Sequence, residues 1–143
     1  MELTVKSFGE LTVHELYEIL RAREDIFTHE KGMKCHDIDE NDYNCLHAIL
    51  KENDKLIAYL RAENIGNGCV KIGRVLTRTH GLGHGRALIS LATAAIRERV
   101  GAKTLTVHAQ CDARRFYQNM GFIPTSDEYV EEGVMHISME LKL

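Results

Sequence analysis

Three closely spaced glycines form the clearest chemical feature of the sequence. They lie in the segment His80-Gly81-Leu82-Gly83-His84-Gly85-Arg86, directly before an apolar helical pattern. Glycine allows positive φ and a close approach of a ligand to the backbone, and successive N–H groups at the start of a helix attract anions. The segment, to which Arg86 adds a cation, therefore predicts a site for a phosphate or pyrophosphate group.

The spacing excludes two common phosphate-binding loops. No Gly-Lys-Ser or Gly-Lys-Thr sequence ends the segment, and Gly81, Gly83 and Gly85 do not supply Gly-x-Gly-x-x-Gly. The missing lysine, and the lack of an obvious Mg²⁺-binding carboxylate after the loop, argue against a nucleotide-binding protein. A glycine-rich turn without a ligand is the other interpretation.

Residues capable of acid–base chemistry are dispersed along the chain. Histidines titrate near neutral pH, and His47, His108 and His136 all lie on predicted strands. The sequence does not single out any one of them as a general base. Arg61 and Arg74, also on predicted strands, are either ion-pair partners or substrate clamps.

Acidic residues gather in two places, a long segment over residues 28–45 without periodicity and the region near the C-terminus. If both border a substrate channel, they favour a cationic amine; a solvated acidic surface is the alternative. Cys35-His36 with Cys45 and His47 matches no common zinc spacing, so no metal site is expected. The acidic residues are Asp37, Asp39, Glu40, Asp42, Glu128, Glu131 and Glu132.

The first helix is predicted from a capping signal. Thr12-Val13-His14-Glu15 has the spacing of a capping box and follows residues 2–8, whose alternation indicates a strand. Apolar residues then recur with a helical period. We expect the core-facing stripe to be Val13, Leu16, Tyr17, Leu20 and Phe27, with Glu15, Glu18, Arg21 and Glu24 facing solvent.

The rest of the chain alternates between strand and helix patterns. Asn53-Asp54 and Gly66-Asn67-Gly68 are turns that join three strands into an antiparallel meander. The glycine segment leads into a helix that ends at Gly101, and Asp112 caps a short helix that ends at Gly121. The predicted strands span residues 46–52, 55–65, 69–77, 104–109 and 134–141, and the longer helix spans 86–100.

This order of elements predicts an α/β fold with a mixed, mostly antiparallel sheet flanked by helices. Three antiparallel strands precede a helix that crosses over to a parallel strand. Open α/β sheets bind small molecules where strand ends meet a helix N-terminus, so we expect the ligand at the strand, glycine loop and helix unit. A length of 143 residues predicts one domain, residues 1–143.

The amino-acid composition limits which kinds of partner the protein is expected to bind. The chain carries 18 Lys and Arg against 21 Asp and Glu, a net charge of -3, and so lacks a basic field that would gather nucleic acid. No apolar run approaches the roughly 20 residues that span a bilayer, and the N-terminus lacks a signal-peptide pattern. We expect a cytoplasmic protein without nucleic-acid or membrane partners. The cysteines form no CxxC pair and are expected to be free thiols: Cys35, Cys45, Cys69 and Cys111.

Two motifs in this order resemble the GNAT superfamily of N-acetyltransferases. Gly83-His84-Gly85-Arg86-Ala87-Leu88 is similar to the end of the family's acetyl-CoA loop, Gln/Arg-x-x-Gly-x-Gly/Ala, with His80 where Arg or Gln is usual. Residues 113–122 match the family's Ala-x-x-Phe/Leu-Tyr-x-x-x-Gly-Phe. The resemblance is nearest to the small ElaA-like branch, through Leu16-Tyr17, Leu20-Arg21-Ala22-Arg23, Ile26-Phe27, Glu30, Asp37-Ile38-Asp39, His47, Gly73-Arg74-Val75, Glu132-Gly133 and His136-Ile137.

The resemblance implies an acetyl-CoA pocket between two splayed strands. Tyr117 matches the family's usual general acid, and a phenol can donate a proton to a departing thiolate. A core tyrosine is the alternative. His136 is implied as a base or substrate contact, and a bound water is the other candidate base. The residues implied in acetyl-CoA binding are Val75, Leu76, His80, Gly81, Leu82, Gly83, His84, Gly85, Arg86, Gln110 and Ala113.

The function that this resemblance implies is direct transfer of an acetyl group from acetyl-CoA to a primary amine of a small molecule or peptide. The alternative is a non-catalytic CoA-binding or regulatory module that keeps the fold, which the histidine at position 80 leaves open. The acceptor is not identified, because fold does not determine substrate. Edge strands of such a sheet could also pair to form a homodimer.

Overall fold

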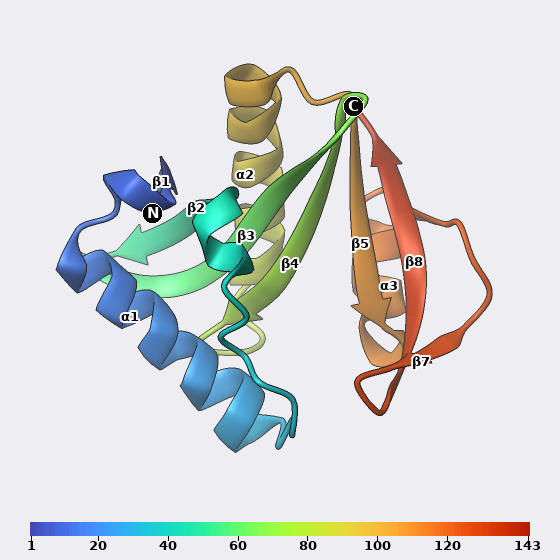
Figure 1. The fold of residues 1–143 in the computed structure, drawn as a ribbon, viewed down its shortest axis with the longest axis horizontal. Helices are drawn as coiled ribbons and strands as arrows, with labels where there is room; N and C mark the ends of the chain where they lie inside the picture. The colour runs from blue at the N-terminus through green and yellow to red at the C-terminus, as the bar shows by residue number, and fades with distance from the viewer.

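Eight strands form one mixed sheet in the computed structural model, which describes residues 1–143 (Figure 1). The order across the sheet is β1-β2-β3-β4-β5-β8-β6, with β7 paired to β8. The β4–β5 pair is parallel and the other pairs are antiparallel, which confirms the predicted fold class. The strands are β1 (Glu2–Ser7), β2 (Cys45–Glu52), β3 (Lys55–Gly66), β4 (Cys69–Thr77), β5 (Thr104–Gln110), β6 (Ile123–Pro124), β7 (Tyr129–Glu131) and β8 (Val134–Lys142).

Helices cover both faces of the sheet. The larger core lies between the sheet and helices α2 (His84–Val100) and α3 (Arg114–Asn119). A smaller core lies beneath α1 (Val13–Arg23), which covers β2, β3 and β4 on the opposite face (Figure 1). None of the helices is long and apolar enough to cross a membrane. Short helical turns complete the chain: Phe8–Glu10, Glu24–Glu30, Asn41–Asn44 and Cys111–Ala113.

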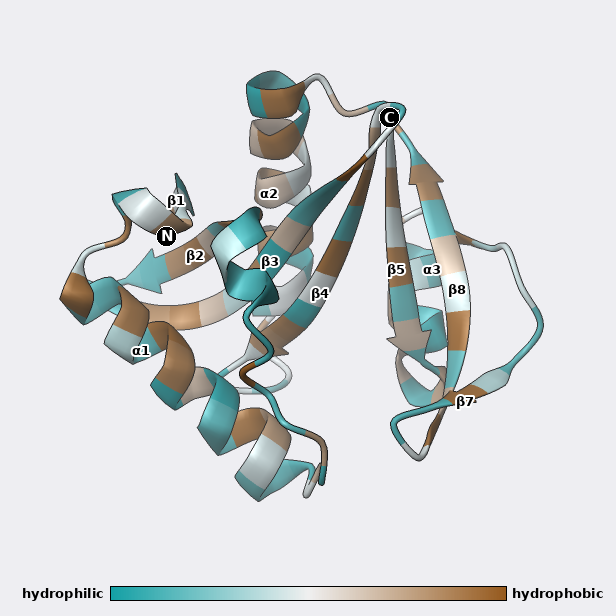
Figure 2. Ribbon diagram, viewed as in Figure 1, coloured by the Kyte–Doolittle hydropathy of each residue, from teal (hydrophilic) through white to brown (hydrophobic).

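Alternation along β5 and β8 assigns one face to the core and the other to the site (Figure 2). Side chains of successive strand residues point to opposite faces. The apolar set packs into the larger core, whereas His108 and His136 belong to the other set, as the period of β8 predicts. The apolar set is Leu105, Val107, Ala109, Ile137 and Met139.

The predicted core-facing stripe of the first helix is wrong in part: Phe27 is buried and Leu16 and Leu20 are half-buried, but Val13 and Tyr17 do not face the core. Val13 and Tyr17 are 83% and 67% exposed, whereas Ile19 and Ala22 are buried. The helix carries apolar residues on two faces, and its buried face also holds Glu15 and Arg23. The apolar pattern predicted that Glu15 faces solvent and made no prediction for Arg23. Glu15 is buried because Lys6 Nζ lies 2.9 Å from its Oε1. The ion pairs of these two residues were not visible in the pattern.

Most of the other boundaries agree with the sequence. α2 begins two residues before its predicted start and ends at Gly101, whose φ of 66° is the left-handed cap conformation. Asp112 does not cap α3, because the turn Cys111–Ala113 leads directly into that helix and leaves Ala113 at its start. Strands β6 and β7 were not predicted, since two or three residues are too few to show a period.

The capping box at the start of α1 is present. Glu15 N–H donates to Thr12 Oγ1 at 3.1 Å, and Thr12 N–H donates to Glu15 Oε1 at 2.8 Å. Because Thr12→Ala removes the capping oxygen, we expect it to destabilise the protein by about 1 kcal/mol, or to lower Tm by roughly 3–4 °C. Thr12→Ser, which keeps the hydroxyl, is the control. Equal Tm values for the two variants in calorimetry would show that the cap contributes nothing.

Candidate active site

The site begins where β4 and β5 separate. Their parallel pairing ends at Ile72 and Val107, although each strand continues beyond this point. On its other side β4 stays paired with β3 as far as Thr77. The backbone groups of β4 that face β5 are therefore free of a strand partner beyond Ile72. This observation agrees with the two splayed strands that the family resemblance implies.

A bulge in β4 accompanies the separation. Between the Arg61–Gly73 and Tyr59–Leu76 pairs, β4 has one residue more than β3. Arg74 lies in this stretch with φ of 51°, in the left-handed region that non-glycine residues rarely adopt. Bulges bend a strand and increase its twist. The bulge therefore turns β4 away from β5.

A cavity of about 470 Å³ occupies the gap between the diverging strands. Its walls come from β3, β4, β5, the β7–β8 hairpin, the turn into α3 and the segment between α1 and β2. Leu76 does not line it, because its side chain is buried beneath α1. The predicted site residues that line the cavity are Val75, Gln110, Ala113, Tyr117 and His136.

The predicted glycine loop lies beyond the end of β4 and outside the lining of this cavity. Gly81 and Gly83 have φ of 81° and 76°, and a Cβ on either would meet nothing within 4 Å. No side chain caps α2, whose first hydrogen bond runs from Ala87 N–H to Gly83 O at 3.1 Å. The turn thus combines open space with unpaired amides, which suits an anion.

An ion pair and a histidine–carboxylate contact join this turn to the π-helix Glu24–Glu30. Arg78 Nη1 lies 2.8 Å from Asp25 Oδ2, and His80 Nε2 contacts the Glu30 carboxylate. The hydrogen bond from Arg78 lowers the pKa of the Asp25 carboxyl. The side chain of His80 is thus engaged with the protein. Leu82, His84, Gly85 and Arg86 complete the predicted segment at the start of α2.

Tyr117 lines the cavity and lies between two other aromatic rings. It is 5% exposed, and its ring meets the rings of Phe116 and Phe122 edge to face at 5.1 and 5.4 Å. Burial raises the pKa of the Tyr117 phenol. The hydroxyl is therefore protonated at neutral pH and is available as a proton donor.

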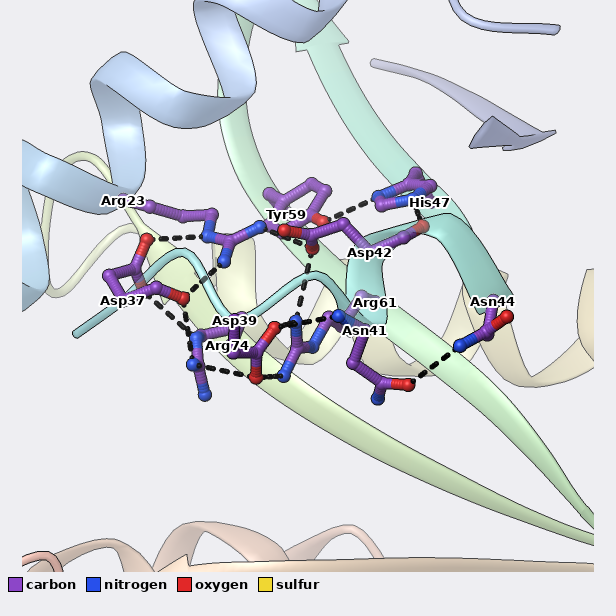
Figure 3. A network of polar contacts seen from close by, with 10 residues as sticks. All are labelled: Arg23, Asp37, Asp39, Asn41, Asp42, Asn44, His47, Tyr59, Arg61 and Arg74. Atoms are coloured by element: carbon purple, nitrogen blue, oxygen red, sulfur yellow. Dashed lines mark hydrogen bonds and ion pairs between the residues drawn. The ribbon is translucent and has the colours of Figure 1, made fainter. Parts of the chain in front are cut away.

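Three arginines and three aspartates hold the segment between α1 and β2 against the sheet (Figure 3). Arg23 is fully buried; its Nη1 donates to Asp42 Oδ1 at 2.6 Å, and its Nε donates to Asp37 Oδ2 at 2.8 Å. Arg61 binds both oxygens of Asp39 at 2.7 Å and also reaches Asp42 Oδ1 at 3.1 Å. These contacts fix the segment as one wall of the cavity.

Arg74 joins the bulge to the same network. Its Nη2 donates to the Asp37 carbonyl at 2.8 Å, and its Nε lies 2.8 Å from Asp37 Oδ1, without the alignment of a good hydrogen bond. Asp39 Oδ2 is 3.3 Å from Arg74 Nη2. Arg61 and Arg74 are therefore ion-pair partners. Asp37, Asp39 and Asp42 are neutralised by arginines, so they do not form an unpaired acidic surface.

His47 is part of the buried interior. Its Nε2 donates to the Asp42 carbonyl at 2.9 Å, and its Nδ1 lies 2.7 Å from Tyr59 Oη. Burial lowers the pKa of the His47 imidazole and raises that of the Tyr59 phenol. Both ring nitrogens are occupied, and His47 is not among the residues that line the cavity. It is therefore excluded as the base.

The β7–β8 hairpin brings a carboxylate between the other two histidines. Glu131 Oε1 is 3.1 Å from His108 Nδ1, and Glu131 Oε2 is 3.8 Å from His136 Nε2. All three residues line the cavity. In the sequence, Glu131 stands out only as one of the acidic residues near the C-terminus. A signal for its position was present, because Glu132-Gly133 suits a two-residue hairpin loop. Such a loop pairs Glu131 with Val134 and Tyr129 with His136, so Glu131 lies two residues from the strand partner of His136.

The fold, a mixed and mostly antiparallel sheet flanked by helices, is that of the GNAT family. A family model described as an acetyltransferase (GNAT) domain matches residues 27–143. The chain belongs to this family. It is 33% identical to Protein ElaA of Escherichia coli, over 92% of this chain and 90% of that protein.

Two further similarities extend over nearly the whole chain. A UPF0039 protein of Schizosaccharomyces pombe is 35% identical over 100% of this chain and 98% of its own length. The crystal structure of Escherichia coli ElaA superposes with a TM-score of 0.88 at 31% identity, covering 98% of this chain and 99% of that one. An acyl-CoA N-acyltransferase from Pseudomonas aeruginosa gives a TM-score of 0.88 at 28% identity, with the same coverage.

The arginine–aspartate network predicts a loss of stability in acid. The hydrogen bonds from Arg61 lower the pKa of the Asp39 carboxyl to about 2, and arginine contacts also lower that of Asp42. A carboxyl whose pKa is lower in the folded state stabilises the protein above its unfolded pKa, near 3.8. We expect the free energy of unfolding to fall as pH drops from about 5 to about 2.

Urea unfolding over this pH range tests the expectation. Asp39→Asn should flatten part of the acid decline, because it removes a group that takes up a proton on unfolding. Asp127→Asn is the control, since Asp127 is exposed and makes no ion pair. An unchanged slope in Asp39→Asn would show that this aspartate does not couple folding to pH.

Proposed function

We propose that the protein is an N-acetyltransferase that moves an acetyl group from acetyl-CoA directly to a primary amine of a small molecule or peptide. The observation that carries the proposal is the cavity between the diverging strands, which reaches Tyr117 on one side. β4 runs from this cavity to the glycine turn. A thioester and a diphosphate can therefore be held along one strand.

The residues present fit acetyl-CoA. Gly81 and Gly83 leave open space outside a turn with unpaired amides, which suits the diphosphate. The unpaired edge of β4 offers backbone groups at Val75 and Leu76 to the amides of the pantetheine arm. Gln110, whose Nε2 lies 3.6 Å from Met33 Sδ, faces the same cavity from β5. No metal is part of this proposal.

When bound, acetyl-CoA supplies a thioester whose carbonyl carbon is open to attack by an amine. Tyr117, which lines the cavity and is protonated at neutral pH, donates its Oη proton to the sulfur that departs. Cys45 also lines the cavity, but burial raises the pKa of its thiol to about 11. The thiol is thus a poor nucleophile at neutral pH, which favours direct transfer over an acetylated Cys45.

Thermal melting with candidate ligands tests the binding half of the proposal. Acetyl-CoA or CoA at about 100 times Kd should add about 2.7 kcal/mol and raise Tm on the order of 5–10 °C. ATP and NAD should have no such effect. A shift without turnover of any amine would favour a non-catalytic CoA-binding module, and no shift at millimolar acetyl-CoA would overturn both readings.

Two glycines of α2 provide a matched pair for the diphosphate site. Gly83 and Gly101 flank the two ends of the helix with φ of 76° and 66°, and both have open space around them. Leucine at either position is strained by positive φ. Only Gly83→Leu should also abolish the Tm shift given by CoA, because its side chain enters the anion site. Retention of the full shift in Gly83→Leu would remove the turn from the binding site.

Removal of the Tyr117 hydroxyl tests the general acid. We expect Tyr117→Phe to lower kcat by about 100-fold or more, the usual contribution of a general acid, and to leave the CoA-induced Tm shift unchanged. Tyr17→Phe, on the exposed face of α1, is the control. Release of CoA is followed with a thiol reagent. If kcat of Tyr117→Phe matches that of the wild type across pH, the assigned role is wrong.

A further inference from the structure

Glu131, His108 and His136 form a cluster that has no role in the functions proposed for Tyr117 and the glycine turn. The hairpin turn Glu132-Gly133 pairs Tyr129 with His136, and β5 pairs Gln110 with His136 on the other side. His136 thus lies between two strands that bound the cavity. Its side chain is 7% exposed, so water is largely excluded from the ring.

A backbone contact determines which nitrogen of His136 carries the proton. Nδ1 lies 2.8 Å from the Val134 carbonyl oxygen, which can only accept a hydrogen bond. Nδ1 is therefore the donor, and in the neutral ring Nε2 carries the free lone pair. The Tyr129 ring stacks on the imidazole at 6.2 Å with an interplanar angle of 23°. The direction of Nε2 is thereby fixed.

The group that faces this lone pair is another acceptor. Glu131 Oε2 lies 3.8 Å from His136 Nε2, too far for a hydrogen bond, whereas Oε1 is already engaged at 3.1 Å by His108 Nδ1. With the imidazole neutral, no side chain of the protein donates a hydrogen bond to Glu131 Oε2 or His136 Nε2, and the Glu131 carboxylate, which is 40% exposed, is open to the cavity. The arginines of the cavity wall do not supply one, because Arg61 and Arg74 are held by aspartates.

We propose that Glu131 and His136 bind the primary ammonium group of the acceptor and that His136 Nε2 removes its first proton. This inference rests on the proposed function. An ammonium donates one N–H to Glu131 Oε2 and another to His136 Nε2, which fills both empty acceptors. Quaternary amines carry no N–H and are excluded from the site. Tyr129 is a positioning residue, since it holds the ring of His136 and donates no group to the reaction.

The protons of the reaction then balance. The ammonium nitrogen loses two protons as it becomes an amide. The first passes to His136 Nε2 and on to solvent. The second replaces the proton that Tyr117 gives to the sulfur, as the carbon–nitrogen bond forms and the carbon–sulfur bond breaks.

Ammonium binding can be measured without acetyl-CoA. We would follow the imidazole signals of His136 by NMR in the wild-type chain as butylammonium chloride is added, with 1-butanol and tetramethylammonium chloride as comparisons. A saturable change is expected with butylammonium alone. It should disappear in Glu131→Gln and persist in Glu132→Gln, the neighbouring cavity carboxylate, which makes no ion pair with either histidine.

Kinetics with butylamine separate binding from proton transfer. Glu131→Gln should raise KM for the amine by about 10- to 100-fold, the size expected of a charged hydrogen bond, while Glu132→Gln leaves it unchanged. His136→Gln should lower kcat by about 100-fold and remove the acid limb of the pH profile. His108→Gln is measured beside it, because His108 contacts both Tyr129 and Glu131, the titratable groups that face His136.

The outcomes distinguish the two proposals. Equal effects of Glu131→Gln and Glu132→Gln on KM, or a wild-type pH profile in His136→Gln, would overturn the ammonium site. Acetylation of butylamine by the wild type would still uphold the proposed function in that case. Butylammonium binding at His136 without turnover of any amine would uphold the ammonium site and overturn the acetyltransferase proposal. An unaltered CoA-induced Tm shift in both site variants confirms that they are folded and bind the donor.

Discussion

The contacts between Arg74 and the segment that carries Asp37 and Asp39 are the constraint on which the site depends. A non-glycine residue in the left-handed region costs about 1–3 kcal/mol, and Arg74 adopts it within the bulge of β4. The two aspartates hold its side chain and offset this cost. The bulge turns β4 away from β5, and the cavity occupies the space that this divergence leaves.

The same contacts determine which walls of the cavity carry net charge. Asp37, Asp39 and Asp42 balance Arg23, Arg61 and Arg74, so this wall of the cavity presents little net charge (Figure 3). A fully buried arginine requires such partners, because an unpaired charge in the interior is costly. The cavity carboxylate that faces histidines instead of arginines lies on the opposite side, in the β7–β8 hairpin.

Much of this structure could be predicted from sequence, since periods of two and 3.6 residues and the turn residues report on local structure. The strands β2 to β5, the helix α2 and the face of His136 follow from such signals. The face of α1 did not, because Glu15 and Arg23 are buried only through distant ion pairs. Nor could the bulge be found, since Arg74 carries no local signal for positive φ.

The short parallel pairing of β4 with β5 affects the rigidity of the sheet. The strand pairing that joins the half of the sheet with β1 to β4 to the half with β5 to β8 is only four residue pairs long, from Cys69 with Thr104 to Ile72 with Val107 (Figure 1). A ligand bound between the free edges, as proposed for acetyl-CoA, would complete the missing connection as an additional strand does. Occupancy should therefore stiffen the whole molecule along this line, and hydrogen exchange on both halves would slow together.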